Sequence, residues 1–232
     1  MKYTVAEVGK KKFLKAKENL PKDFNVVNAG GYDRVVKLAA DPKAELVKLV
    51  VDNLRATNGS GSYSDDDGKL SAIAALLSSE GKGFSSLAVD GEWYEVLAKQ
   101  GKMSNKTQKL IGKRKKTTRP TSDFNVKALS FENVVSTPRG NGALKALVKY
   151  TPVAKNFDKT SDGKIVLRRI ACDIVSATFK YRFFPRLSLP FLKKKGGFLD
   201  FVYMDDDIRV TTGNRGGLFV HFRPSYYDQV VN

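Results

Sequence analysis

From Gly91 onward, apolar and polar residues alternate, and this period of two constrains the fold more than any other feature of the sequence. Turn-forming residues interrupt the alternation at spacings of about 8–12 residues, which is typical of a meandering antiparallel sheet. The predicted strands cover residues 92–98, 124–131, 143–150, 164–172, 174–184, 198–204, 207–211 and 218–223. We therefore expect this part of the chain to consist of short β-strands.

The turns between these strands support closure into a barrel. Gly213 and Asn214 can form a tight turn because both tolerate positive φ. Pro120, Pro138 and Pro190 fall between predicted strands, where no ladder hydrogen bond is lost. About eight successive strands predict an up-and-down barrel or a strongly curved sheet. Such a barrel is either filled by its own side chains or holds one small apolar ligand, and the sequence leaves both alternatives open.

Helical periodicity marks the segment before the strands. Asp41 can cap free backbone N–H groups, and Pro42 fits the first helical turn. Apolar residues then recur at helical spacing, which predicts a helix over residues 42–56. A second helix follows and ends at Gly81.

These patterns divide the chain into three parts. Residues 1–40 lack sustained periodicity and are predicted to form an irregular basic arm with one short helix. Residues 41–90 form a helical layer, and residues 91–232 form the barrel. The expected fold class is mainly β, of the α+β type, with an antiparallel β-barrel and an N-terminal helical layer.

The chain contains one cysteine, Cys172, and one histidine, His221, which limits the chemistry it can perform. An intrachain disulfide and a zinc site built on Cys/His clusters are excluded. A Ser–His–Asp or Cys–His catalytic pair would have to use His221 itself, which we expect to be structural, and Cys172 is expected to be an inert core thiol. We therefore expect a non-enzymatic protein without a cofactor or a metal ion.

Apolar stretches such as residues 46–51 are far shorter than the ~18 residues that a membrane-spanning helix requires, so we expect a soluble protein with no transmembrane span. The first residues resemble neither a signal peptide nor an acid-poor transit peptide. We therefore expect that either the chain needs no targeting segment or a presequence is missing from it.

The formal charge of +17 indicates an anionic partner, such as lipid headgroups, nucleic acid or an acidic protein assembly. Residues 91–232 hold 27 basic and 12 acidic side chains and so carry most of this charge. One cluster of cations lies between two predicted strands, in an expected exposed loop that contains Lys113, Arg114, Lys115 and Lys116. This loop is a candidate contact for the anionic partner.

Aromatic and aliphatic residues interleave with cations over residues 179–195. Such a segment can insert apolar side chains at a lipid interface while its basic groups meet phosphates. It is equally consistent with a strand whose aromatic residues face inward. No RNA- or DNA-binding motif accompanies it, so we do not expect nucleic acid as a partner. The candidate cations are Arg182, Arg186, Lys193, Lys194 and Lys195.

A longer motif lies near the end of the chain. Tyr203 and Met204 precede the acidic cluster 205–207, which is followed by Arg209, a Gly-containing turn and an apolar last strand. This block resembles the terminal block of the plastid lipid-associated protein family, also called fibrillins or plastoglobulins. With weaker motifs, including Gly91-Glu92-Trp93, the resemblance extends from residue 41 to residue 223.

The resemblance implies a lipocalin-like barrel that binds a hydrophobic small ligand, a lipid or an isoprenoid, and a plastid location at the thylakoid or plastoglobule. It also implies that Arg209 covers the indole of Trp93 and closes the barrel floor. Asp205 and Asp207 are then candidates for a polar rim at the barrel mouth, and Tyr203 is a further candidate residue of the ligand site or barrel. The alternative for the acidic cluster is a solvated turn or a salt bridge to nearby lysines. We expect Arg223 to have little interaction with Trp93.

A second hypothesis uses the same fold differently. The barrel would be filled, and the protein would be a basic scaffold subunit in the cytoplasm or cytoskeleton. Its arm and loops would dock on an acidic assembly such as the microtubule, because the basic arm at residues 1–40 is not part of the family pattern.

Overall fold

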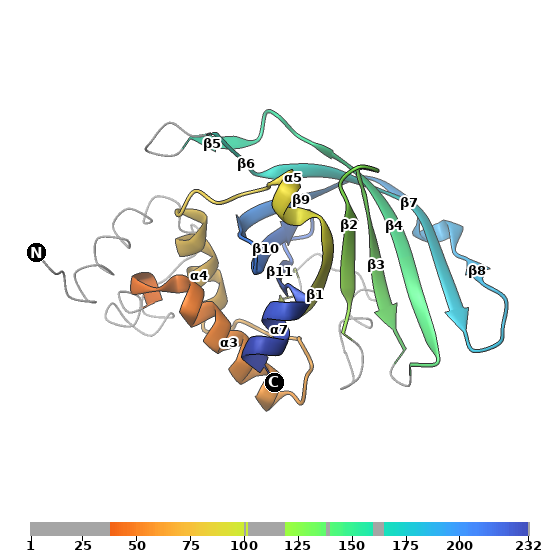
Figure 1. Ribbon diagram of the computed structural model, residues 1–232, viewed down its shortest axis with the longest axis horizontal. Coiled ribbons are helices and arrows are strands. Elements are labelled where there is room, and N and C mark those ends of the chain that lie inside the picture. Colours follow the sequence, from red (N-terminus) through yellow and green to blue (C-terminus); the bar gives the residue numbers. More distant parts are fainter. Residues whose placement is uncertain (1–37, 100, 102–118, 138–139, 160–164, 232) are drawn as a thin grey trace, which may run out of the picture.

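The computed structural model describes residues 38–99, 101, 119–137, 140–159 and 165–231. Its helices and strands are arranged as a barrel with helices against one side (Figure 1). In chain order the elements are α3 (Pro42–Ala56), α4 (Lys69–Ser78), α5 (Ser86–Val89), β1 (Gly91–Lys99), β2 (Thr121–Asn125), β3 (Ser130–Ser136), β4 (Gly142–Pro152), β5 (Phe157–Lys159), β6 (Ile165–Leu167), β7 (Arg169–Tyr181), β8 (Leu187–Ser188), the short 3₁₀ helix η2 (Pro190–Leu192), β9 (Lys194–Met204), β10 (Ile208–Gly213), β11 (Leu218–Phe222) and α7 (Pro224–Val231).

Eight of these strands close into an antiparallel barrel in the order β1-β2-β3-β4-β7-β9-β10-β11, and β11 returns to β1. The pairing of β4 with β7 runs from Gly142 opposite Tyr181 to Pro152 opposite Ile170 and joins the two halves of the sheet. Strands β5 and β6 form a separate hairpin, and β8 adds to β7 outside the barrel. The predicted mainly β, lipocalin-like barrel is confirmed.

Three strand predictions were wrong in detail. The predicted strand 164–172 is divided at Arg168 between β6 and the start of β7. Residues 124–131 do not form one strand, because a turn separates β2 from β3 and places Leu129 at φ 47°. Conversely, the predicted break at Asp173 is not a turn, since β7 runs through it as one strand. The register of β7 shifts at Asp173 against β9 and at Val175 against β4, so bulges interrupt the alternation without ending the strand.

The helices agree with the periodicity. Helix α3 has the predicted bounds, and the Asp41 side chain accepts a hydrogen bond from the Ala44 backbone N–H at 3.0 Å. Asp65 supplies the corresponding cap for α4, because it accepts hydrogen bonds from the backbone N–H groups of Leu70 and Ser71. Helix α7 was not predicted. The arm at residues 1–40 lies outside the described residues except for residues 38–40, which are helical.

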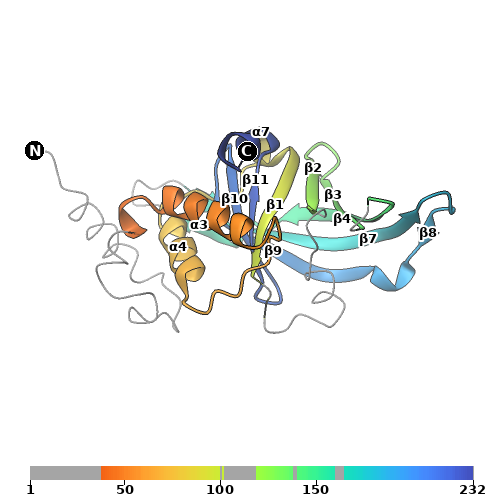
Figure 2. The ribbon, with the colours of Figure 1, turned by 90° about the horizontal axis from the view of Figure 1, so that it is seen from below.

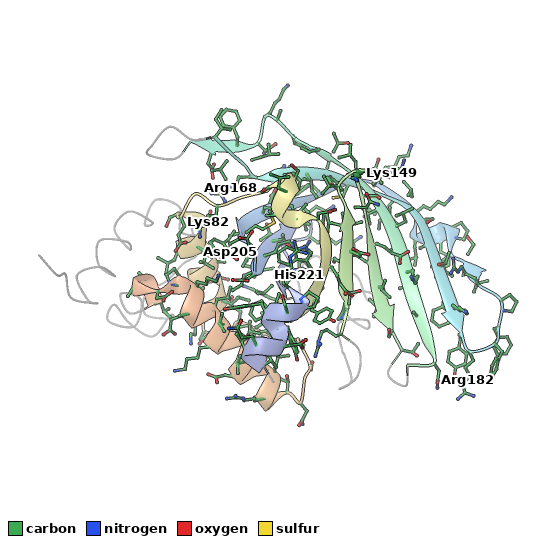
Figure 3. The ribbon with its side chains drawn as sticks, in the orientation of Figure 1. Lys82, Lys149, Arg168, Arg182, Asp205 and His221 are labelled. Atoms are coloured by element: carbon green, nitrogen blue, oxygen red, sulfur yellow. The ribbon has the colours of Figure 1, made fainter. Side chains whose placement is uncertain are left out.

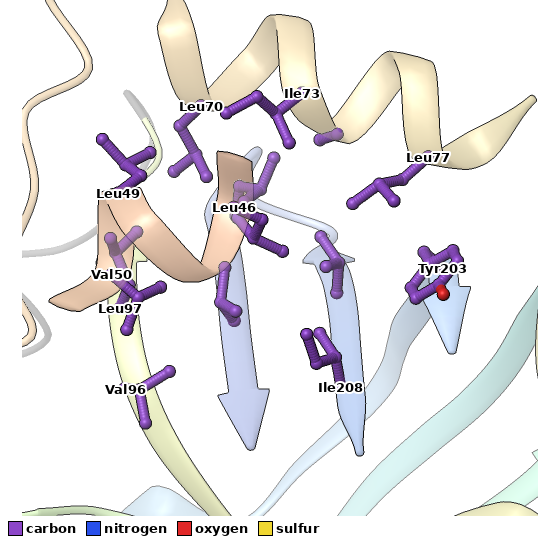
Figure 4. Close-up of a cluster of buried hydrophobic side chains, with 14 of the residues drawn as sticks. Leu46, Leu49, Val50, Leu70, Ile73, Leu77, Val96, Leu97, Tyr203 and Ile208 are labelled. Atoms are coloured by element: carbon purple, nitrogen blue, oxygen red, sulfur yellow. The ribbon is translucent and has the colours of Figure 1, made fainter. Parts of the chain in front are cut away.

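The larger core lies between the helices and the outer face of the barrel (Figure 4). Leu46 and Val50 of α3 and Ile73 of α4 are buried against outward side chains of β1, β10 and β11, such as Ile208 and Val220. Each buried side chain of this size contributes about 1.5–3 kcal/mol, so apolar contact holds the helical layer on the barrel. Among the helices of the described residues, none combines the length and apolar character needed to cross a membrane.

A polar cluster adds to this contact at the start of α3. Lys43 donates to Asp205 at 2.7 Å and to Asp207 at 3.1 Å, and Tyr203 donates its hydroxyl proton to Asp205 at 2.6 Å. The Asp205 carboxylate also accepts from the backbone N–H groups of Asp207 and Ile208. Burial raises the pKa of Asp205, but these hydrogen bonds outweigh it and hold that pKa below its ordinary value of 3.8.

We predict that Asp205→Asn lowers the free energy of unfolding by about 1.5–3 kcal/mol at pH 7, because it weakens several hydrogen bonds to a charged group. The adjacent, exposed Asp206 provides a matched control, and Asp206→Asn should change the free energy of unfolding by less than about 0.5 kcal/mol. Denaturant titrations of both variants measure this difference.

The pH dependence has a defined sign. Because the folded pKa of Asp205 is depressed, its contribution is fully present well above the ordinary value of 3.8 and is lost as the pH falls through the folded value. The gap between the wild type and Asp205→Asn should therefore close in acid. Equal losses of unfolding free energy for the Asp205 and Asp206 variants at pH 7 would show that the hydrogen bonds of Asp205 do not stabilise the fold specifically.

Candidate functional site

The interior of the barrel contains a cavity of about 440 Å³, which we call the lumen. It reaches the end of the barrel where β2 and β9 begin and β10 ends, and we call this end the mouth. The apolar lining includes Phe124, Phe131, Val135, Val148, Ile174, Leu199 and Phe219. The polar lining includes Glu95, Ser122, Asn133, Arg209, Thr211 and His221. The lumen is thus mostly apolar with a few polar groups, as is typical of a site for a small hydrophobic ligand.

The opposite, closed end of the barrel is filled by an aromatic cluster around Trp93. Trp93 is fully buried, and its indole N–H donates to the Val89 carbonyl at 2.8 Å. Val89 ends the short helix α5, which precedes β1. Gly91 between them has φ 85°, a conformation that favours glycine, so the chain can turn sharply from α5 into the strand.

Two arginines contact this indole. The Arg209 guanidinium carbon lies 5.1 Å from the Trp93 ring centroid and 4.8 Å from that of Phe124, so the structure brings Arg209 and Trp93 together. The Arg223 guanidinium is closer to Trp93, at 3.9 Å, and the expectation of little interaction for Arg223 is wrong. Arg223 also donates to the backbone carbonyls of Glu92 and Ala88, which fastens α5 to β1. Sequence spacing could not show this contact.

Arg209 lies in an environment that is unusual for an arginine. Arg209 is 1% exposed, and Nε and Nη1 of its guanidinium have no hydrogen-bond partner among the described residues. Burial, followed by repulsion from Arg223, lowers the pKa of Arg209 to about 9. The group therefore remains charged at neutral pH, with its charge facing aromatic rings and the lumen.

The other predicted site residues lie elsewhere. Tyr203, Asp205 and Asp207 do not line the lumen, since they lie at the end of β9 and in the turn to β10, at the closed end. Asp205 and Asp207 accept hydrogen bonds from Lys43 of α3, and Tyr203 donates to Asp205. They join the helical layer to the barrel, and no rim at the mouth is formed by them. In Figure 3, Asp205 accordingly lies on the side of the barrel that faces the helices.

The single cysteine and histidine both reach the lumen. Burial, with a smaller effect of Asp173, raises the pKa of Cys172 to about 12, so the thiol is protonated at neutral pH. His221 lies on the inward face of β11 opposite Arg209 of β10. Glu95 was missed by the sequence analysis, although its position two residues after Trp93 on β1 places it on the same face.

A second candidate surface projects from the barrel on the side away from α3 and α4 (Figures 1 and 2). We call residues 181–195 the basic flap; they comprise the end of β7, β8, η2 and the first residues of β9. Phe183 is fully exposed, and Phe184, Leu187 and Phe191 are each more than half exposed. The five predicted cations Arg182, Arg186, Lys193, Lys194 and Lys195 are all exposed.

The basic flap contains five cations and no acidic residue. Its aromatic side chains face outward, so the alternative of an inward-facing strand does not hold for this segment. Lys194 also lines the lumen, so the flap adjoins the mouth. The loop with Lys113, Arg114, Lys115 and Lys116 lies outside the described residues.

Comparison with known proteins gives one result. The family model PAP_fibrillin matches residues 30–221 of the chain. No curated protein and no solved structure shows significant similarity to it.

We predict that Trp93→Ala destabilises the protein by about 3–5 kcal/mol, because it leaves a cavity in the aromatic cluster. In a double-mutant cycle, Arg223→Met should show a coupling energy with Trp93→Ala of more than about 0.5 kcal/mol, since their side chains touch. Arg182→Met at the exposed flap should be additive with Trp93→Ala. Denaturant unfolding measures all four states, and additivity of the Trp93–Arg223 pair would contradict the contact.

Proposed function

The chain belongs to the PAP_fibrillin family, and on that basis we propose that it is a non-enzymatic lipid-associated protein with two contacts to lipid. The lumen holds one hydrophobic ligand, a lipid or an isoprenoid, and the basic flap docks on an anionic lipid surface. The observation that carries the proposal is the lumen itself, because a barrel filled by its own side chains would leave no cavity of about 440 Å³.

The lining of the lumen supports a small apolar guest. The cavity falls within the range of about 300–1,000 Å³ found for small-molecule sites. Aromatic residues such as Phe131 and Phe219 offer broad apolar contact, while Ser122 and Asn133 satisfy each other through a hydrogen bond of 2.7 Å. Most of the guest would therefore contact hydrocarbon.

The basic flap supports the second contact through its combination of charge and exposure. Side chains such as Phe183 and Phe191 are exposed to solvent, which is unfavourable unless they insert into an apolar phase. The surrounding cations complement anionic headgroups, and each contributes about 1 kcal/mol near such a surface. Because Lys194 is shared with the mouth, a docked flap would hold the lumen open toward the lipid.

The proposal also includes a location for the protein in the plastid and a role in binding rather than catalysis. Membership of the family supports a plastid location at plastoglobules or thylakoids. A protonated Cys172 is a poor nucleophile, which supports a binding role rather than thiol catalysis.

We predict that Nile red, an uncharged probe, gains fluorescence in the lumen and that Val135→Trp reduces its binding several-fold by occupying the cavity. Val134 lies beside it on β3 and does not line the lumen, so Val134→Trp is the matched control and should leave binding unchanged. If the wild-type protein gives no signal and mass spectrometry of the purified protein shows no lipid, the barrel is filled and the scaffold hypothesis is favoured.

We predict that the protein sediments with liposomes containing anionic lipid and that salt weakens this binding. Replacement of Lys193, Lys194 and Lys195 by Gln should lower partitioning by about two orders of magnitude, at about 1 kcal/mol per lysine. Phe183→Ser should weaken it further through lost insertion.

The matched control changes the same charge at the other end of the barrel. Lys127, Lys149 and Lys155 are exposed near the ends of β2 and β4, and their replacement by Gln should leave sedimentation nearly unchanged. Equal losses for the two triple variants would show that only net charge matters. Equal sedimentation with neutral liposomes would contradict electrostatic docking.

A further inference from the structure

The position of Arg209 gives the lumen a charged inner end. Arg209 lies on the inward face of β10, lines the lumen and is 1% exposed. The next inward residue of the same strand is Thr211, which is fully buried and also lines the lumen. Two hydrogen-bonding side chains from one strand therefore face the same cavity.

Each of these side chains has buried polar atoms without a hydrogen-bond partner in the described part of the chain. Nε and Nη1 of Arg209 and the hydroxyl of Thr211 have no hydrogen-bond partner there. No ion pair of Arg209 occurs among the described residues either, and the neighbouring Arg223 adds repulsion. Contacts with the rings of Trp93 and Phe124 offset only part of the desolvation of a buried cation.

A buried cation without a counter-ion is destabilising, whereas one that meets an anion in a low-dielectric site forms a strong, charge-assisted hydrogen bond. We propose that the lumen binds a long-chain carboxylic acid, whose carboxylate lies on the Arg209 guanidinium and the Thr211 hydroxyl. This inference rests on the proposed lumen function and specifies the chemical class of its ligand.

The charge of the lining favours a single negative charge. Among the described residues that line the inner end of the lumen, Arg209 is the only one with a guanidinium, and the side chain of Glu95 lies on the same lining. Two further cations lie toward the mouth: Lys194 is the first residue of β9, and Arg215 follows the end of β10 by two residues. A carboxylate matches one guanidinium, while a phosphate monoester carries about −1.5 to −2 charges at neutral pH and would need a second cation.

The remaining lining suits the hydrocarbon chain. Leu199, Phe219 and Val135 are part of the apolar wall that continues from the inner end to the mouth. A fatty acid in a bilayer exposes its carboxylate to water, so it would meet the mouth beside the basic flap with its head first. Entry in that direction brings the carboxylate to Arg209 and leaves the chain behind it.

Displacement of Nile red from the full-length protein tests the proposal with three ligands that share one chain: oleic acid, methyl oleate and oleyl phosphate. Oleic acid should bind at least about tenfold more tightly than its methyl ester, which corresponds to about 1.4 kcal/mol. It should also bind more tightly than the phosphate. Isothermal titration of the same ligands gives an independent measurement.

Variants assign the preference to the two side chains. Arg209→Met keeps a flexible, unbranched side chain but removes its charge, so it should abolish the preference for the acid over the ester. Thr211→Val should reduce the preference by several-fold, and the neighbouring Thr212→Val, outside the lining, should not change it. Far-ultraviolet circular dichroism and thermal unfolding check that the variants are folded.

The wild-type comparison needs no variant and separates the two proposals. Equal binding of acid and ester would overturn the carboxylate assignment while the lumen function stands. Binding of neither would overturn both. Tighter binding of the phosphate would overturn the choice of carboxylate, and an acid preference that survives Arg209→Met would overturn the role of Arg209.

Discussion

Closure of the barrel through the β4–β7 pairing is the constraint on which the rest of the structure depends. Without it the sheet would have two free edges and no lumen. Once the sheet closes, each strand has an inward and an outward face. On β10 and β11 the outward residues, such as Val210 and Val220, are buried against the helices, while the inward residues, such as Arg209 and His221, line the lumen. The helical layer and the lumen are therefore two consequences of one closure.

The two ends of the barrel differ for physical reasons that follow from this arrangement. At the closed end, Trp93 and its aromatic neighbours exclude water, and Arg223 fastens α5 over them. At the mouth, the first residues of β9 continue into the basic flap. The lumen therefore has a buried cation, Arg209, at its closed end and the exposed cations of the basic flap at its mouth. The buried cation favours a ligand with negative charge, and the exposed cations favour a surface with negative charge.

Local patterns predicted much of this fold. The bounds of α3 followed from a cap at Asp41 and a helical period, both of which act within a few residues. Strands β1, β4, β9, β10 and β11 followed from alternation. Local patterns failed where tertiary contacts decide: the bulge beside Asp173 looked like a turn, and the turn between β2 and β3 looked like a strand. A salt bridge to a lysine was one interpretation of the acidic cluster at Asp205, but the sequence could not identify the lysine, because no local signal reports the approach of Lys43 from 162 positions away.

By itself, the sequence determined the class of fold, the helices that precede it, the excess of positive charge and the family, because caps, periodicity, composition and motifs are properties of neighbouring residues. Only the tertiary structure decided how much volume remains inside the barrel, which arginine lies nearest Trp93 and which side chains of the basic flap are exposed. Those outcomes depend on strand register and on the volume left between side chains from different strands. A shift of one residue in register exchanges the two faces of a strand, so the sequence of any single strand cannot determine these outcomes.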